Sequence, residues 1–256
     1  MKKPSAKLVT VTNTFSVTPN MQRITLQGEA LADFPLDCEG GYIKLLFNQV
    51  GGTDLSQQAE NSRPVMRTYT IRRFDPNQSQ IEVDFVKHVT EDQQCGFAAR
   101  WAMAAKQGDT IHIAGPGTIQ NMNIDADWFF MTADMTSLPA LSAKIQRLPQ
   151  DAQGYAVIQV QTEDDIQTLE APAGMEIEWV TQESLQDAAK RQPWLEGQVS
   201  VWCACEFDSM RALRQYFRNE HNVDREYIYI SSYWKQGVYE DGHKAIKQQD
   251  ASEQAN

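Results

Sequence analysis

Four arginines lie close together in the first third of the chain, and their spacing suits phosphate binding beside a flat ring. Residues 61–74 include no acid and four arginines, Arg63, Arg67, Arg72 and Arg73. The run 65–74 alternates like a strand, so Arg67 and Tyr69 share one face and Thr70 lies on the other. A guanidinium beside an aromatic ring suits a phosphate carried by a flat heterocycle. A surface arginine next to a core tyrosine explains the same spacing, and that alternative stays open.

A second candidate is the segment Cys95-Gly96-Phe97-Ala98-Ala99-Arg100-Trp101. Its small residues stand where a loop is expected to become a helix over 97–106. At such a junction the backbone N–H groups and the positive end of the helix are accessible to a pyrophosphate. An ordinary helix start with Trp101 as a core anchor is the competing interpretation.

The cysteine and histidine patterns indicate neither a metal centre nor disulfides. Cys38 and Cys95 are isolated, and Cys203 and Cys205 form a CxC instead of the CxxC typical of zinc and iron–sulfur sites. The histidines, at 88, 112, 221 and 243, have no ligand spacing. We therefore predict structural cysteines, no bound metal and no side-chain nucleophile.

Composition excludes several classes of protein. The 256 residues have a net charge of −11, and all of it lies in residues 125–256, since residues 1–124 hold 12 basic and 12 acidic side chains. A negative total disfavours nucleic acid and anionic membranes as partners. No run approaches the roughly 20 apolar residues of a membrane span, and the start has no apolar signal region. A cytoplasmic protein without membrane insertion is expected.

The elements that must position these residues fall into two groups. In residues 1–124, strands are predicted at 7–14, 21–27, 41–47, 65–74, 80–88 and 110–114, with one helix at 97–106. This spacing favours an N-terminal antiparallel β-barrel domain. In residues 125–247, strands and helices alternate, which is typical of a Rossmann-like α/β domain with a parallel sheet. The polar residues 248–256 are predicted to be a disordered tail.

Short motifs occur in a specific order along residues 7–247. The first half carries Arg67-Thr68-Tyr69-Thr70, Asp84-Phe85-Val86-Lys87-His88, the segment 96–101 and Gly115-Pro116-Gly117. The second half carries Thr132-Ala133-Asp134-Met135-Thr136-Ser137-Leu138-Pro139-Ala140, Cys205-Glu206 and Tyr233-Trp234-Lys235-Gln236-Gly237. This ordered set resembles the siderophore-interacting proteins, which are ferric-siderophore reductases related to the ferredoxin–NADP reductase superfamily.

The resemblance implies an FAD site in residues 1–124 and a nicotinamide site in residues 125–247. Arg67 would bind an FAD phosphate, Tyr69 would lie against the isoalloxazine, and Thr70 would hydrogen-bond near flavin N5. The other implied FAD contacts are Asp84, Phe85, Val86 and His88 along a strand, and Ala98, Ala99 and Trp101 in the pyrophosphate turn. The implied NADH or NADPH contacts are Asp134, Thr136, Ser137 and Glu206. The chain departs from the family at Phe97, Met135 and Cys205, where the family has proline, an acid and glycine.

The implied reaction passes electrons from NADH or NADPH through FAD to Fe(III) held by a hydroxamate or catecholate siderophore. An anionic iron complex needs cations, and the candidates are Lys44, Lys235, Lys244 and Lys247. Three alternatives stay open: ferredoxin as the electron donor, a general flavin or ferric-chelate reductase, and a non-catalytic siderophore-binding flavoprotein. The acidic second half would repel an acidic ferredoxin, which favours the nicotinamide donor.

Overall fold

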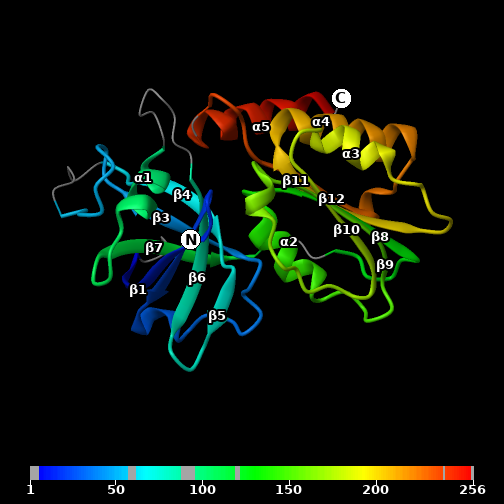
Figure 1. The fold of residues 1–256 in the computed structure, drawn as a ribbon. Helices are drawn as coiled ribbons and strands as arrows, with labels where there is room; N and C mark the ends of the chain where they lie inside the picture. The colour runs from blue at the N-terminus through cyan, green and yellow to red at the C-terminus, as the bar shows by residue number, and fades with distance from the viewer. Residues whose placement is uncertain (1–5, 57–61, 88–95, 119–121, 239, 255–256) are drawn as a thin grey trace. The chain divides into compact units, whose positions relative to one another are not determined.

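The chain forms two compact units. A computed structural model describes residues 6–56, 62–87, 96–118, 122–238 and 240–254 (Figure 1). The units are Met1–Ile119 and Gln120–Asn256, so the division lies slightly before the boundary at residue 124 that the sequence suggests. None of the helices in these described ranges is long and apolar enough to cross a membrane.

The first unit is built on one antiparallel sheet of seven strands. In chain order these are β1 (Lys7–Thr18), β2 (Met21–Gln27), β3 (Tyr42–Phe47), β4 (Val65–Thr70), β5 (Arg73–Asp75), β6 (Gln80–Val86) and β7 (Thr110–Gly117). Their order in the sheet is β4-β3-β7-β1-β2-β6-β5. Helix α1 (Phe97–Ala104) buries Ala98 and Ala102 against the core of this unit.

The sheet is not the closed barrel that the strand spacing favours. Strands β4 and β5 are its two edges, and they follow one another in the chain. The run predicted as one strand over 65–74 is interrupted at Ile71 and Arg72. The Ile71 N–H donates to Gly41 beside β3, and the next N–H, of Arg72, donates to Glu82 on β6. The chain therefore passes between the two edges within two residues, and no ladder joins β4 to β5 in the described residues.

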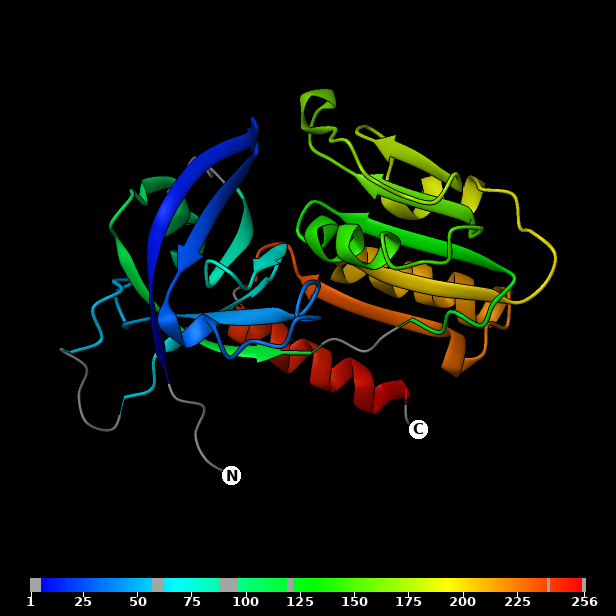
Figure 2. The same ribbon diagram turned by 90° about the horizontal axis from the view of Figure 1, so that it is seen from below.

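The second unit is a parallel sheet between helices, as the alternating pattern predicts (Figures 1 and 2). Its strands are β8 (Trp128–Asp134), β9 (Gln153–Gln159), β10 (Gly174–Val180), β11 (Val199–Glu206) and β12 (Ile228–Trp234). Helix α2 (Leu138–Ile145) lies on one face, whereas α3 (Leu185–Arg191) and α4 (Phe207–Arg214) lie on the other. Every residue of β8 is buried, which is typical of a central parallel strand.

The strand order of this sheet reverses between β8 and β11. The order is β10-β9-β8-β11-β12, so the chain moves outward from β8 through β9 to β10 and then returns to the other side of β8. In open α/β sheets, ligands bind outside the carboxyl ends of the strands at such a switch point. The ends of β8 and β11 are Asp134 and Glu206, two of the residues proposed above for nicotinamide binding.

The predicted disordered tail is wrong for residues 248–254, because helix α5 spans Glu240–Gln254. Arg214 on α4 binds both carboxylate oxygens of Asp250, with N–O distances of 2.7 and 2.8 Å. Ile246 packs against the apolar core of the second unit. The polar composition of residues 248–254 could not predict these contacts, because the partner of Asp250 lies on a different helix.

Candidate functional site

Arg67 and Tyr69 lie on one face of β4, as the strand alternation predicts. In the register with β3, Arg67 stands opposite Leu45 and Tyr69 opposite Ile43. Directly opposed residues in an antiparallel pair share a face. Since Leu45 and Ile43 are fully buried, this is the core-facing side of the sheet.

Three predicted FAD contacts form a row of aromatic rings drawn from three elements. The Tyr69 ring on β4 lies 4.4 Å from the Phe85 ring on β6, measured between centroids. The Phe85 ring is 5.8 Å from the Trp101 indole on α1 and meets it edge to face. Phe85 is buried, whereas Tyr69 and Trp101 are half-buried. The row therefore has a core member and two members that keep part of their surface accessible.

Two guanidinium groups approach one ring at the start of α1. The Phe97 ring lies 5.9 Å from Arg67 on β4 and 5.2 Å from Arg100 on α1. The preceding Gly96 is the N-cap, and an added Cβ there would meet nothing within 4 Å. No acid lies in the first turn of α1. Two cations and a helix N-terminus that is open among the described residues are features that suit a phosphate.

The candidate list from the sequence missed Arg100. On a helix, residues three apart share a face, so the spacing between Phe97 and Arg100 is the signal that could have found it. The Phe97 ring packs against Gly51, where an added Cβ would stand 2.7 Å from the ring. The phenyl ring therefore fills the space that Gly51 leaves.

The remaining predicted FAD contacts differ in whether their side chains are accessible. Asp84 points to the face opposite Phe85, where Arg23 on β2 binds both of its carboxylate oxygens at 2.6 and 2.8 Å. Its side chain is thus occupied, which leaves its backbone for a cofactor. Val86, Ala98 and Ala99 are buried. His88 lies outside the described residues.

Lys44 lies on the opposite face of the sheet from Arg67 and Tyr69. In the register it stands opposite Thr68 on β4 and Ala114 on β7, and it shares a face with Tyr42 and Thr70. Within the part of the chain that the structure describes, Lys44 makes no hydrogen bond or ion pair. Its half-buried ammonium is accordingly available to an anion on the Thr70 side.

The four predicted nicotinamide contacts come together at the switch point of the second unit. Asp134 ends β8, and its carboxylate accepts hydrogen bonds from the Thr136 N–H at 2.9 Å and the Glu206 N–H at 2.8 Å. The indole Nε1–H of Trp234 on β12 donates to the same carboxylate at 2.7 Å. Burial raises the pKa of the Asp134 carboxyl, and the hydrogen bonds from Thr136 and Trp234 oppose that rise.

Ser137 and Glu206 tie the same strand ends together. The Ser137 hydroxyl donates to the Ala204 carbonyl on β11. The Glu206 carboxylate caps α4, since Oε2 accepts from the N–H of Asp208 at 2.5 Å. Its other oxygen accepts from the Gln236 N–H at 3.2 Å. These side chains therefore fix the backbone at the carboxyl ends of β8 and β11.

The C-terminal lysines proposed for the substrate differ in how they are engaged. Lys235 forms an ion pair with Asp208 at 2.9 Å and lies 4.9 Å from the centroid of the Phe207 ring. Lys247 donates to the Ser231 hydroxyl and the Ser232 carbonyl, and burial lowers its pKa. Lys244 is half-buried on α5 and also has a partner. These interactions make all three weaker candidates than Lys44.

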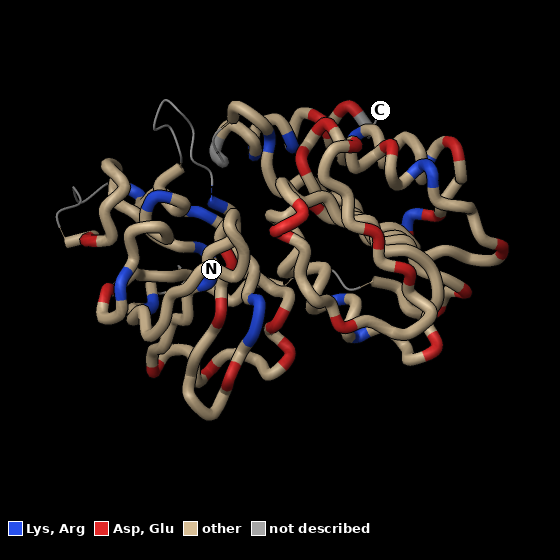
Figure 3. Tube along the Cα trace, in the orientation of Figure 1, with Lys and Arg blue, Asp and Glu red and all other residues tan. Residues whose placement is uncertain are grey.

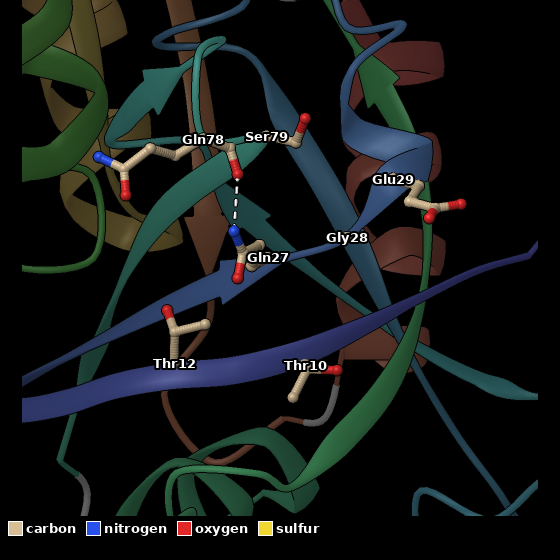
Figure 4. Close-up of a pocket in the computed structure, with 7 residues that line it drawn as sticks. All are labelled: Thr10, Thr12, Gln27, Gly28, Glu29, Gln78 and Ser79. Atoms are coloured by element: carbon tan, nitrogen blue, oxygen red, sulfur yellow. Dashed lines mark hydrogen bonds between the residues drawn. The ribbon is translucent and has the colours of Figure 1, made fainter.

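A shallow hollow elsewhere in the first unit contains none of the predicted residues. Figure 4 shows it between β1, β2 and the turn before β6, with a hydrogen bond of 2.9 Å from Gln27 Nε2 to the Gln78 carbonyl. Thr10, Thr12 and Ser79 also line it. Its walls present no cation and no aromatic ring, so it does not suit a flavin nucleotide.

Two protein-family models match the chain, one in each unit. Residues 10–120 match the siderophore-interacting FAD-binding domain, and residues 126–237 match the siderophore-interacting protein model. The ferric vibriobactin reductase of Vibrio cholerae is 32% identical over 243 residues, which cover 89% of this chain and 88% of the relative. The NADPH-dependent ferric-chelate reductase of Escherichia coli is 26% identical over 239 residues, covering 88% and 91%.

A solved structure agrees with these matches over almost the whole chain. The siderophore-interacting protein SipS from Aeromonas hydrophila superposes with a TM-score of 0.85 at 30% identity, covering 97% of this chain and 99% of that one. The likeness extends across both units, so it includes the sheet with the arginine and aromatic cluster as well as the sheet with the switch point.

Proposed function

Because the chain belongs to the siderophore-interacting protein family, we propose that it is an FAD-dependent ferric-siderophore reductase that takes electrons from NADH or NADPH. Two curated relatives that cover most of the chain bear the names of ferric reductases, one for vibriobactin and one for ferric chelates. The observation that carries the proposal is the pair of guanidinium groups, Arg67 and Arg100, at the Phe97 ring, in the unit that matches the FAD-binding domain and with Tyr69 on the same strand face as Arg67.

The residues of the first unit fit FAD by their chemistry. Arg67 and Arg100, with the open N-terminus of α1, would hold the pyrophosphate. Tyr69 would lie against the isoalloxazine, and Thr70 would hydrogen-bond near N5. Bound FAD supplies the conversion of a two-electron hydride donor into single electrons. The task of the protein is then to orient the flavin and to hold the iron complex beside it.

The substrate we propose is Fe(III) bound by a hydroxamate or catecholate siderophore. Oxygen-rich ligands hold Fe(III) far better than Fe(II), so reduction weakens the complex and releases iron. One hydride carries two electrons and reduces two ferric complexes. Lys44, on the Thr70 face, would attract an anionic complex. This chemistry requires no side-chain nucleophile.

The charges of the second unit suit NADH better than NADPH as the electron donor. Residues 148–189, which include β9 and β10, contain no lysine or arginine. The turn after β9 exposes Glu163 and Asp164, and a capping box between Thr162 and Asp165 closes it. In doubly wound sheets an acid after the second strand binds the ribose 2′-hydroxyl, whereas a 2′-phosphate needs a cation. A 2′-phosphate would meet only negative charge at this turn.

An acidic ferredoxin is a poorer donor on the same grounds. Acidic side chains are spread over the second unit (Figure 3), which holds 22 of them and 11 basic ones. Repulsion between like charges would slow the encounter with an acidic partner. A cytoplasmic reaction suits a nicotinamide donor. Cys38, Cys203 and Cys205 form no disulfide among the described residues, which suits a reducing compartment.

The proposal is tested anaerobically with the purified protein loaded with FAD. NADH is added while the flavin absorbance is followed, and a ferric siderophore is added next with a chelator that traps Fe(II). Bleaching by NADH followed by trapped Fe(II) is the expected result. A colourless protein that fails to bind added FAD would exclude the reductase reading. A flavin that NADH, NADPH and reduced ferredoxin all leave oxidised would point to a binding flavoprotein.

A further inference from the structure

The carboxylate of Asp134 accepts hydrogen bonds on both oxygens from N–H groups, which can only donate, and Oδ1 also accepts from the Thr136 hydroxyl at 2.5 Å. Oδ1 accepts from the backbone N–H of Thr136 at 2.9 Å and of Ser137 at 3.3 Å. Oδ2 accepts from the Glu206 N–H at 2.8 Å and from Trp234 Nε1–H at 2.7 Å. Asp134 is 7% exposed, so these donors surround it. A nucleotide would have to displace one of them to reach the carboxylate.

The bond to Trp234 links strands that are not neighbours in the sheet. Asp134 ends β8 and Trp234 ends β12, while β11 runs between them. The two residues are 100 positions apart in the chain. In the ladder between β11 and β12, the register shifts after Cys205, so that Glu206 pairs with Trp234. Irregularities of this kind re-aim a side chain at the end of a strand, and they are common beside active sites.

A second carboxylate holds the backbone that follows Trp234. Glu206 donates its N–H to Asp134 and accepts the Gln236 N–H on Oε1 at 3.2 Å. Trp234 is thereby anchored through its indole, and the next turn is anchored through its main chain. Trp234 is half-buried, which leaves part of the ring accessible at the switch point. The ring has one polar atom, Nε1, and Asp134 fixes the direction of that atom.

We propose that Asp134 is a positioning residue for the nicotinamide nucleotide and that it acts through Trp234. On this proposal, which rests on the proposed reductase function, the indole forms a wall of the crevice at the switch point and the carboxylate never touches the nucleotide. Asparagine cannot replace aspartate here, because its NH₂ group would face an N–H donor on one side or the other. The role differs from the direct contact that the family resemblance implies for Asp134.

The test compares Asp134→Asn, Trp234→Phe and the double variant as FAD-loaded proteins. Anaerobic stopped-flow with NADH separates the dissociation constant from the limiting rate of flavin bleaching, and calorimetry with NAD⁺ measures binding without turnover. Each single variant is expected to weaken nucleotide binding by about tenfold, the usual scale for losing a hydrogen bond to a charged group. The limiting rate should stay within about twofold. The double variant should bind no worse than the weaker single variant.

Asp127→Asn is the matched control, because Asp127 precedes β8 at the end opposite Asp134 and its carboxylate also accepts a backbone N–H, that of Gln198, at 2.6 Å. It should lower the melting temperature and leave nucleotide binding unchanged. The inference is overturned if Trp234→Phe, which keeps the ring, binds both nucleotides like the wild type. It is also overturned if the losses in the two single variants multiply in the double variant. If the wild-type protein binds NAD⁺ but NADH does not bleach its flavin, the proposed reductase function is contradicted. The NAD⁺ affinities of the variants, compared with the wild type, still test the role of Asp134 in that case.

Discussion

The Arg23 guanidinium binds both oxygens of the Asp84 carboxylate, with N–O distances of 2.6 and 2.8 Å. The pair joins β2 to β6 on the face opposite Phe85, and the Asp84 side chain is 3% exposed. The hydrogen bonds that Arg23 donates to Asp84 raise the pKa of Arg23, as expected for a guanidinium held by a carboxylate. Asp84 thus stabilises the sheet that carries the aromatic row, a role distinct from side-chain contact with FAD.

Replacing Asp84 should damage stability far more than cofactor binding. Asp84→Ala leaves the half-buried Arg23 cation with only its longer ion pair to Glu82, at 3.4 Å, which costs about 3 kcal/mol of unfolding free energy. Urea unfolding measures that loss, and FAD titration of the folded variant should give a dissociation constant within about twofold of the wild type. Asp33→Ala, an exposed acid between β2 and β3, is the control and should change neither quantity. A large loss of FAD affinity in folded Asp84→Ala would restore Asp84 as a cofactor contact.

Arg100→Gln should weaken FAD binding by about tenfold, because a charge-assisted contact to phosphate is lost. The effect should shrink as salt is raised, since ions screen an exposed cation. Fluorescence quenching of FAD on addition of apoprotein measures the affinity. The matched control is Arg63→Gln, because Arg63 is an exposed arginine in residues 61–74, the stretch that includes Arg67. This variant should bind FAD normally. Equal losses in both variants would indicate a general effect of charge instead of a site at Phe97.

The sequence predicts relationships within one strand well, and it does so for a physical reason. Alternation along an extended chain places Arg67 and Tyr69 on one face, and the register with Leu45 and Ile43 confirms it. The pairing of Asp84 with Arg23 was missed, because it joins residues 61 positions apart. Nothing local distinguishes a carboxylate that faces an arginine from one that faces a ligand.

The wild-type protein should use NADH at least about tenfold more efficiently than NADPH in kcat/KM, because the turn after β9 offers acids and no cation to a 2′-phosphate. Asp164→Arg should narrow that ratio by raising the efficiency with NADPH. Flavin bleaching at a series of nucleotide concentrations gives both values. Glu170→Arg, an exposed acid beyond the turn in the same cation-free stretch, should leave the ratio unchanged. A wild-type preference for NADPH would place the 2′-phosphate elsewhere.

His243 should make the protein less stable in mild acid. The residue is 4% exposed, and its Nε2 lies 2.8 Å from the Ser232 hydroxyl. Burial is the main cause that lowers the pKa of His243 to about 4. The charges of Lys247 and Lys235 also lower this pKa, and the charge of Glu206 opposes the change. As pH falls through 6.5, the His243 imidazole takes up a proton in the unfolded chain, whereas in the folded chain it does so only near pH 4. Stability contributed by the neutral form is therefore lost between these values, by about 2 kcal/mol from pH 7 to pH 5. Urea unfolding at both values should show a smaller difference in His243→Asn.

The second unit shows where composition misleads. Residues 248–254 are polar and lack a clear apolar stripe, which favours disorder, yet Asp250 is held by Arg214 and the helix continues. In contrast, the parallel sheet followed from the predicted alternation of strands and helices, and the observed strand order then places the ends of β8 and β11, Asp134 and Glu206, at the switch point. What the sequence left undetermined is the bond from Trp234 to Asp134, which depends on two strand ends separated by a third.

Lys44→Ala should raise the KM for anionic ferric complexes by severalfold and leave the KM for a neutral hydroxamate complex unchanged. Lys44 shares the face of Thr70, which the proposal places beside flavin N5, and it has no ion-pair partner in the described residues. Its charge is therefore free to attract an anion, and the attraction should weaken as salt is raised. Lys44→Arg keeps the charge and should retain most of the affinity, whereas Lys87→Ala, whose ammonium donates to the Ser16 hydroxyl, should change neither KM. If the neutral complex suffers as much as the anionic one, Lys44 supports the shape of the site and not its charge.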